Sequence, residues 1–223
     1  MDALSLLLNR HSCGRLTTPA PSGEVLDNIL KAGLRAPDHG TLTPWQFILF
    51  EGEGRERLGT LLADAARTRG EDEDSIKKCS EAPLRAPLVV AVATRYQAHP
   101  KVPKLEQELS AGCALMAMQM AAQAQGFNGI WRSGWFIFDE QIHGALGLAP
   151  EDQLVGFLYL GTPCWRPASC ASCPSRTSCA ASEAHNAKSP DYSGLFCFLT
   201  KPSGCTDKCA LAKRGEGGWP DIF

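Results

Sequence analysis

The stretch Gly129-Ile130-Trp131-Arg132-Ser133-Gly134 follows the longest helical pattern of the chain. Its glycines permit a backbone to lie close against a flat ligand, and the indole of Trp131 can stack on such a ligand. Arg132 can hold a negative charge beside it. A tight turn between a helix and a strand would use the same glycines. The stretch therefore predicts either a ligand-binding loop or a simple turn.

The helical pattern before this stretch runs from Lys104 to Gln125, and Gly126 supplies its C-terminal stop. One stripe of the pattern is bulky and another is small. The bulky stripe consists of Leu105, Leu109, Cys113, Met116 and Met120, and the small stripe consists of Ala114, Ala117, Ala121 and Ala124. Because small side chains let a neighbouring backbone approach closely, we expect a central helix that is packed on two sides, with its methionines in the core.

Further helices and strands are expected on both sides of this central helix. Hydrophobic periodicity predicts helices over 2–9, 22–34, 54–69 and 139–146, and strands over 45–50, 87–94 and 154–160. Ser22 is the expected N-cap of the second helix. Because the order does not alternate strictly between strand and helix, the predicted fold class is α+β, with a mixed sheet flanked by helices.

Two polar groups lie where predicted helices end. In Arg10-His11-Ser12 the guanidinium can grip a phosphate with two hydrogen bonds, and Ser12 adds a hydroxyl donor. In Arg35-Ala36-Pro37-Asp38-His39 the fixed φ of Pro37 stiffens the turn that carries Arg35 and His39. A solvated helix end and a surface turn account for the same residues, so each group by itself is weak evidence for a phosphate site.

Composition restricts the classes of function. The chain has 223 residues, 44% of them hydrophobic, and a formal net charge of -2. It has no basic run of the kind that follows a nucleic-acid backbone, so we expect no nucleic-acid partner. The apolar run from Leu4 to Leu8 is far shorter than a signal sequence or a membrane span. The expected location is therefore the cytoplasm, without a membrane partner.

Cysteine usage divides the chain. Only Cys13, Cys79 and Cys113 precede residue 164, whereas seven of the ten cysteines fall between Cys164 and Cys209. We place the boundary at Gly161-Thr162-Pro163. The prediction is a domain over 1–163 and a Cys-rich extension over 164–223.

Three interpretations of the extension compete. Cys170-x-x-Cys173, Cys179 and Cys205-x-x-x-Cys209 superficially suggest zinc or an iron–sulfur cluster, but only one pair has the usual two-residue gap, so no metal site is predicted. A disulfide scaffold is disfavoured in the cytoplasm. The preferred hypothesis is a segment foreign to the fold, divergent or poorly ordered, such as a shifted reading frame would produce.

Five motifs resemble the FMN-dependent nitroreductase family, in particular its small NAD(P)H nitroreductase branch. They keep the order and spacing of that branch and extend over residues 1–163. In chain order they are Arg10-His11-Ser12-x-x-Arg15, Arg35-Ala36-Pro37-Asp38-His39 with Thr43-Pro44-Trp45, Ser110-Ala111-Gly112-Cys113-Ala114, Gly129-Ile130-Trp131-Arg132-Ser133-Gly134, and Gly156-Phe157-Leu158-Tyr159-Leu160-Gly161-Thr162-Pro163.

The resemblance implies a set of cofactor contacts. The residues implied for FMN are Arg10, His11, Ser12, Arg35, His39, Trp131, Arg132 and Ser133. The residues implied for the nicotinamide cofactor are Ala121, Ala122, Gln123, Ala124, Gln125 and Gly126. The family usually has arginine where His11 stands, so one positive charge is weaker here. The family fold is an α+β sandwich whose two copies form an intimate homodimer, with each FMN at the interface.

The implied activity is that of a flavin oxidoreductase. Hydride passes from NADH or NADPH to flavin N5 and then, in a ping-pong sequence, to a nitroaromatic or similar small-molecule electron acceptor. No protein nucleophile is expected, because FMN carries the chemistry. Two alternatives remain open: a flavin-binding scaffold without turnover, and a metal-binding interaction module that uses the late cysteines.

Overall fold

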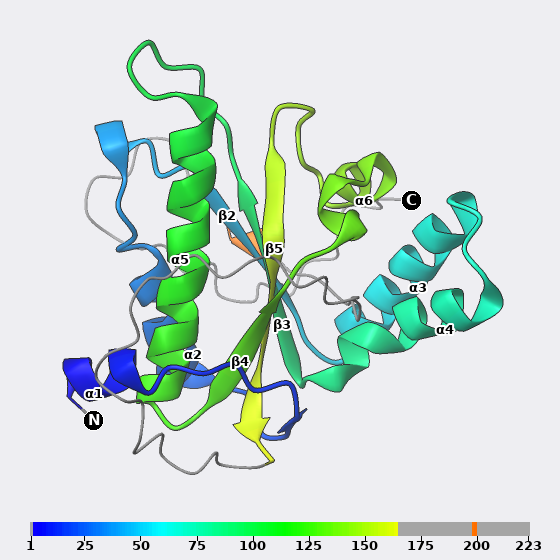
Figure 1. Cartoon of the computed structure of the whole chain (residues 1–223), viewed down its shortest axis with the longest axis horizontal. Helices are drawn as coiled ribbons and strands as arrows, with labels where there is room; N and C mark the ends of the chain where they lie inside the picture. The colour runs from blue at the N-terminus through cyan, green and yellow to red at the C-terminus, as the bar shows by residue number, and fades with distance from the viewer. Residues whose placement is uncertain (1, 165–197, 200–223) are drawn as a thin grey trace, which may run out of the picture.

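The computed structural model describes residues 2–164 and 198–199, and it has the expected α+β class with helices flanking a sheet (Figure 1). The helices are α1 (Ala3–Leu8), α2 (Gly23–Gly33), α3 (Glu53–Thr68), α4 (Glu73–Glu81), α5 (Lys104–Ala124) and α6 (Glu140–Ala145), with short 3-10 helices η1 (His39–Thr41), η2 (Ala82–Arg85) and η3 (Trp135–Phe138). The strands are β1 (Leu16–Thr17), β2 (Trp45–Phe50), β3 (Leu88–Thr94), β4 (Asn128–Arg132), β5 (Gln153–Pro163) and β6 (Phe198–Leu199).

The sheet is built around β5. This strand pairs with β3 along one edge and with β4 and β1 elsewhere, and β2 continues the sheet beyond β3. All the strand pairings among the described residues are antiparallel. Every residue of β3 is buried, as its continuous run of apolar residues predicts for a strand covered on both faces.

Two hydrophobic cores lie on the two faces of the sheet. On one face α2 and α5 pack against residues such as Phe47 and Leu158, and Leu30 and Leu115 face the sheet from these helices. On the other face α3, α4 and α6 contribute the apolar side chains. Figure 1 shows the two helical layers on opposite sides of the central strands. Each face of the sheet is therefore covered by its own helices.

The central helix α5 lies where the sequence predicts it, but most of its bulky stripe is exposed in the part of the chain that the structure describes. Of the bulky stripe, Met120 is 8% exposed, whereas Leu105 and Leu109 are 63% and 61% exposed. The buried face of α5 is instead formed by smaller or central residues, among them Ala114 and Leu115. Helix α5 is packed on two sides as expected, against α2 and against the sheet, but most of its bulky stripe lies outside both contacts.

The glycine stretch that follows α5 is mostly a strand. Gly126 ends the helix with a φ of 88°, the left-handed conformation expected of a C-terminal glycine. Gly129 lies within β4, and a Cβ atom there would lie 2.3 Å from the carbonyl oxygen of Tyr159 on β5. This glycine therefore serves the close approach of two strands, and this stretch is a strand where the sequence predicts a ligand-binding loop or a turn.

The proposed Cys-rich extension lies almost wholly outside the described residues. Cys164 is described, and its N–H donates to the carbonyl of Arg15 at 3.0 Å. Phe198 and Leu199 form β6, which pairs with Ile48 and Phe47 of β2. The cysteine motifs between Cys170 and Cys209 fall outside the described residues, as do the hypotheses that concern them.

Candidate flavin site

The first predicted group, Arg10-His11-Ser12, lies between α1 and β1 in the chain and packs against the start of β4. The N–H of Cys13 donates to the carbonyl of Gly129 at 2.9 Å, and a ring nitrogen of His11 lies 2.9 Å from the amide nitrogen of Asn128. Gln123 of α5 donates to the carbonyl of Asn9 at 3.1 Å. These bonds fix the segment, while Arg10 and Ser12 remain exposed and available to a ligand.

The third predicted group, 131–133, meets this first segment. A guanidinium nitrogen of Arg132 would lie 3.6 Å from a Cβ atom at Gly14, two residues beyond Ser12. The same guanidinium carbon lies 5.7 Å from the ring centre of Tyr159, in cation–π geometry. The structure thus brings Arg132 next to the segment that carries Arg10 and Ser12, as a phosphate-binding group requires.

The indole of Trp131 lies on a shelf made by two glycines. A Cβ atom at Gly156 of β5 would lie 2.2 Å from the indole nitrogen, and one at Gly112 of α5 would lie 3.4 Å from the far end of the ring. Trp131 itself is 40% exposed. Any side chain at Gly156 would displace the ring. The two glycines therefore leave room for the indole of Trp131 against β5 and α5, while part of the residue stays exposed to a ligand. Both belong to motifs quoted above, but only the folded chain shows their role.

The second predicted group, 35–39, contacts α5 through side chains other than the one that faces Trp131. The hydroxyl of Ser110 donates to the carbonyl of Pro37 at 2.5 Å. The side chain of His39 pairs with Glu106, with 2.6 Å between Nδ1 and Oε2. Arg35 and His39 are both exposed. Neither Ser110 nor Glu106 could be given a role from the sequence, because nothing in the pattern of α5 indicates which loop lies beside it.

Helix α5 separates the second group from the third. Ser110 contacts the Pro37 segment, whereas Gly112 faces Trp131. Side chains two positions apart on an α-helix point about 200° away from each other, that is, to opposite sides. One subunit therefore brings together the first and third groups but leaves Arg35 and His39 on the far side of α5.

The residues implied for the nicotinamide cofactor, 121–126, mainly connect α5 to its neighbours. Ala122 and Gln123 are buried, and Gln123 bonds to the α1 segment as described above. Gln125 donates to the carbonyl of Val25 on α2 at 3.3 Å. Ala124 and Gly126 are exposed. A direct contact with NAD(P)H is thus open to these two residues, while the others serve packing in the subunit.

A buried phenol lies beneath Arg132. Burial raises the pKa of Tyr159 well above its ordinary value, while the positive charge of Arg132 acts in the opposite direction. The ring is 1% exposed, and its hydroxyl has no hydrogen-bond partner among the described residues. Tyr159 is consequently neutral across the physiological range, so it supplies a ring face to Arg132 and no charge.

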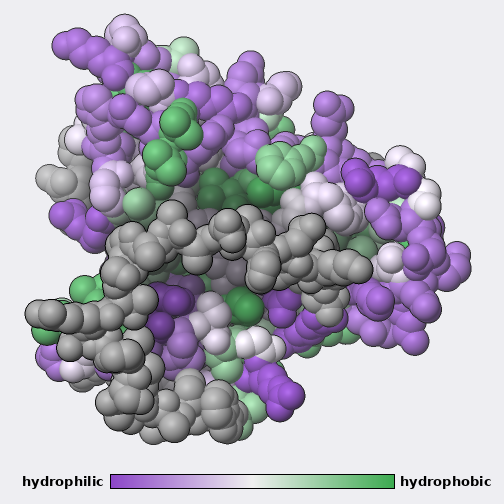
Figure 2. Space-filling view, in the orientation of Figure 1, coloured by the Kyte–Doolittle hydropathy of each residue, from purple (hydrophilic) through white to green (hydrophobic). Residues whose placement is uncertain are grey.

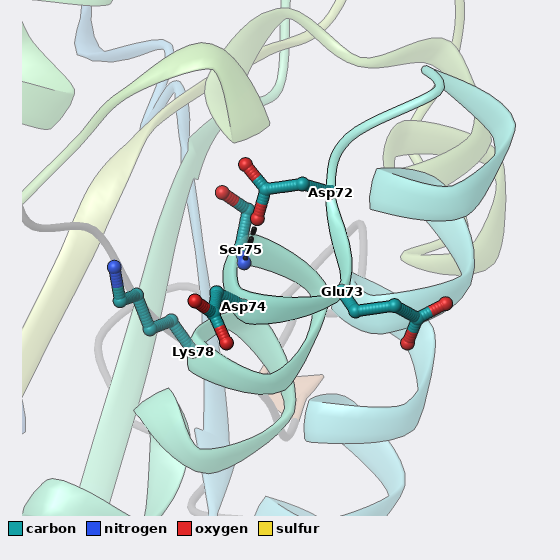
Figure 3. Close-up of a pocket in the computed structure, with 5 residues that line it drawn as sticks. All are labelled: Asp72, Glu73, Asp74, Ser75 and Lys78. Carbon is teal, nitrogen blue, oxygen red and sulfur yellow. Dashed lines mark hydrogen bonds between the residues drawn. The ribbon is translucent and has the colours of Figure 1, made fainter.

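A surface hollow lies away from these groups. It has a volume of about 450 Å³ and is lined by Asp72, Glu73, Asp74, Ser75 and Lys78 at the start of α4 (Figure 3). The carboxylate of Asp72 accepts from the N–H of Ser75 at 2.7 Å, an ordinary N-cap. Three carboxylates and no aromatic ring are the wrong chemistry for a phosphate and a flat ring system, so the hollow is not a flavin site.

Within residues 2–164 and 198–199, no three histidine, cysteine or acidic side chains are grouped so that they could hold a metal ion. A helix with the length and apolar character of a membrane span is likewise not found in this part of the chain.

Comparison with known proteins agrees with the geometry. The chain is 55% identical over 163 residues to "Putative NAD(P)H nitroreductase YdjA" of Escherichia coli (strain K12), a match that covers 73% of this chain and 89% of that protein. A similarly named protein of Haemophilus influenzae is 42% identical over 163 residues, again covering 73% and 89%.

Solved structures show the same fold. A nitroreductase-like family protein from Bacillus cereus superposes with a TM-score of 0.64 at 22% identity and covers 78% of this chain and 92% of that one. A nitroreductase from Desulfovibrio desulfuricans, solved in complex with FMN, gives a TM-score of 0.59 at 21% identity, with coverages of 82% and 97%. The Nitroreductase family model matches residues 7–162. On the fold, the motifs and these matches, the chain belongs to the nitroreductase family.

Proposed function

We propose that this protein is an FMN-dependent oxidoreductase that passes electrons from NADH or NADPH to a nitroaromatic or similar acceptor in a ping-pong sequence. Its family makes it an oxidoreductase that uses FMN and NAD(P)H. The ping-pong order, the class of acceptor and the individual contact residues are part of the proposal.

The observation that carries the proposal is the contact of Arg132, which follows Trp131 in β4, with the segment of Arg10 and Ser12. Guanidinium and hydroxyl groups suit a terminal phosphate, and an indole held flat by Gly112 and Gly156 suits a ring system. The residues that line the hollow on α4 include neither a guanidinium nor an aromatic ring. The residues present therefore fit a flavin mononucleotide at β4 and the segment after α1.

The chemistry supplied by bound FMN is hydride acceptance at N5 from NAD(P)H and delivery to the second substrate. The protein then has three tasks. Arg10 and Ser12 hold the phosphate, Trp131 and Ser133 position the ring, and Arg132 supplies positive potential beside it. Arg132 suits this last task because it is half-buried, where its field is screened less than at the surface. No nucleophile of the protein is required, because the cofactor carries the hydride.

We further propose that two copies of the chain complete the site. Arg35 and His39 lie across α5 from Trp131, so a second copy is the straightforward source of these contacts. The exposed bulky stripe of α5 supports this arrangement, since apolar atoms are gathered there (Figure 2). The stripe continues onto α1, where Leu4 and Leu8 are 63% and 73% exposed. A homodimer would bury both helices.

The test is an absorbance spectrum of the freshly purified full chain before and after each nicotinamide is added. We expect a flavin spectrum that bleaches with NADH or NADPH and returns with a nitroaromatic acceptor. Bound FMN that neither nicotinamide reduces would instead support the scaffold without turnover. Stoichiometric zinc or iron without flavin would support the metal-binding module. The cytoplasmic location and the lack of a nucleic-acid partner stay predictions from composition.

A further inference from the structure

The loop that carries His39 is held in an unfavourable backbone conformation. Three of its residues have a left-handed φ: Gly40 at 78°, Thr41 at 53° and Thr43 at 51°. Glycine adopts this region freely, but the branched Cβ of threonine makes it costly. Two such residues within three positions stay left-handed only if their surroundings over-determine the loop, and such strain is concentrated at functional sites.

The side chain of Asp38 supplies the inner restraint. One carboxylate oxygen accepts from the N–H of Leu42 at 3.0 Å, and the other accepts from the N–H of Thr43 at 2.8 Å. Both oxygens are thus used on the same short loop, and each bond joins the beginning of the loop to its end. Hydrogen bonds that a carboxylate accepts are charge-assisted and stronger than those between neutral groups, so Asp38 closes the loop around Gly40 and Thr41.

Two outer restraints attach the closed loop to its surroundings. On one side Ser110 of α5 bonds to the carbonyl of Pro37, as described above. On the other side the amide of Gln97 donates to the carbonyl of Leu42 at 2.6 Å. Gln97 is itself fixed by Gln107 of α5, which accepts from its N–H at 3.0 Å and donates to its carbonyl at 2.8 Å. Helix α5 therefore determines both ends of the loop.

The restraints leave one group presented to solvent. The imidazole of His39 is held at Nδ1 by Glu106, while 57% of its side chain is exposed. The ring is thus fixed in direction by a carboxylate and remains open to a ligand. Figure 1 shows η1, which carries His39, beside the N-terminal half of α5.

We propose that Asp38 is a positioning residue for the flavin site: it holds loop 39–43 in its strained left-handed form and so presents His39 to FMN. The proposal rests on the proposed function, in which His39 contacts FMN at the interface of two copies. Asp38 itself does not touch the cofactor. Its effect is transmitted through the two backbone N–H groups that it binds.

The experiment measures the Kd for FMN, by fluorescence titration of the apo-protein, in a set of full-length variants. We expect Asp38→Ala to raise the Kd about tenfold or more, the size that the loss of two charge-assisted bonds allows. Asp38→Asn keeps one acceptor oxygen and should raise it less. The double change Thr41→Gly with Thr43→Gly, made in the Asp38→Ala background, should recover most of the loss, because glycine adopts the left-handed conformation without the restraint.

Asp72→Ala is the matched control, because Asp72 also caps a backbone N–H through its carboxylate but lies on α4. It should leave the Kd within about twofold of the wild-type value, in line with a purely local cap. Circular dichroism checks that each variant folds. The positioning role alone would be overturned if Asp38→Ala bound FMN with the wild-type Kd. It would also be overturned if the two glycine changes weakened FMN binding equally in the wild-type and the Asp38→Ala chains. A wild-type chain that binds no FMN would overturn the proposed function together with it.

Discussion

The two sides of the sheet differ in how completely one subunit covers its apolar residues. On the side of α3, the helix buries Leu58 and Leu62 almost entirely, and they are 1% and 0% exposed. On the side of α5, Leu105, Leu109 and Met116 remain 63%, 61% and 44% exposed, although the same helix buries Leu115 completely. On the first side only Leu84 and Phe138, on two short 3-10 helices, are large apolar residues with more than a third of their surface exposed among the described residues. The second side carries an apolar surface that no described residue covers, next to the candidate flavin site, as expected if it meets a second copy.

The strongest test of this difference removes one leucine from each side. Leu62→Ala should lower the free energy of unfolding by about 2–5 kcal/mol, because it leaves a cavity in a closed core. Leu109→Ala removes the same atoms from an exposed position and should cost the isolated subunit less than about 0.5 kcal/mol. Urea denaturation at low protein concentration measures both. Similar losses for the two variants would show that the sides do not differ.

The next test places a charge on each side. Leu109→Glu should raise the dimer dissociation constant at least about 100-fold, because it buries an unpaired carboxylate in the proposed interface. Leu84→Glu is the control: Leu84 is 47% exposed but lies on η2, away from α5. Analytical ultracentrifugation reports the mass and circular dichroism the fold. A Leu109→Glu protein that stays dimeric at nanomolar concentration would contradict an interface on α5.

A third test concerns the shelf beneath Trp131. Gly156→Ala places a methyl group 2.2 Å from the indole nitrogen, so the ring must move, and we expect the Kd for FMN to rise about tenfold. The control is Gly144→Ala on α6, where a Cβ atom would meet nothing within 4 Å. That variant should gain about 0.5–1 kcal/mol of stability and keep its flavin. Normal FMN binding by Gly156→Ala would remove the ring-positioning role of this glycine.

The same comparison explains what the sequence could predict. Helix α5 and strand β2 begin and end within one residue of their predicted bounds, because long periodic or apolar runs depend on local pattern alone. Helix α4 falls outside the predicted elements. It buries only Ile76 and Cys79, too few apolar residues for a visible period, although Asp72 and Ser75 give it a capping signal. The sequence predicts a loop or a turn where β4 lies, because the need for Gly129 arises from the opposing carbonyl of Tyr159, which no local pattern indicates.

The candidate site shows the same limit. Residue type was enough to select Arg10, Ser12 and Arg132 as candidates, and the fold confirms that their segments meet. Arg35 and His39 lie on the side of α5 opposite Trp131, because loop 35–39 passes along that side of the helix. Which side the loop follows is decided by tertiary packing and not by local sequence. The roles of Glu106 and Ser110, one turn apart on α5, depend on it in the same way.

The smallest expected effect is on cysteine reactivity. Cys113 lies on the exposed stripe of α5, whereas Cys79 is buried on α4. Burial, together with the nearby charge of Glu71, raises the pKa of the Cys79 thiol. Because the thiolate is the reactive form, Cys79 should be alkylated slowly near neutral pH and faster only as the pH rises well above the ordinary thiol range.

Peptide mapping after iodoacetamide treatment distinguishes the two sites. If the α5 surface is an interface, Cys113 should be protected in the wild-type dimer and should react several-fold faster in Leu109→Glu, while the rate at Cys79 stays the same. Equal acceleration at both cysteines would mean that Leu109→Glu loosens the whole subunit, and the two sides of the sheet would then not be independent.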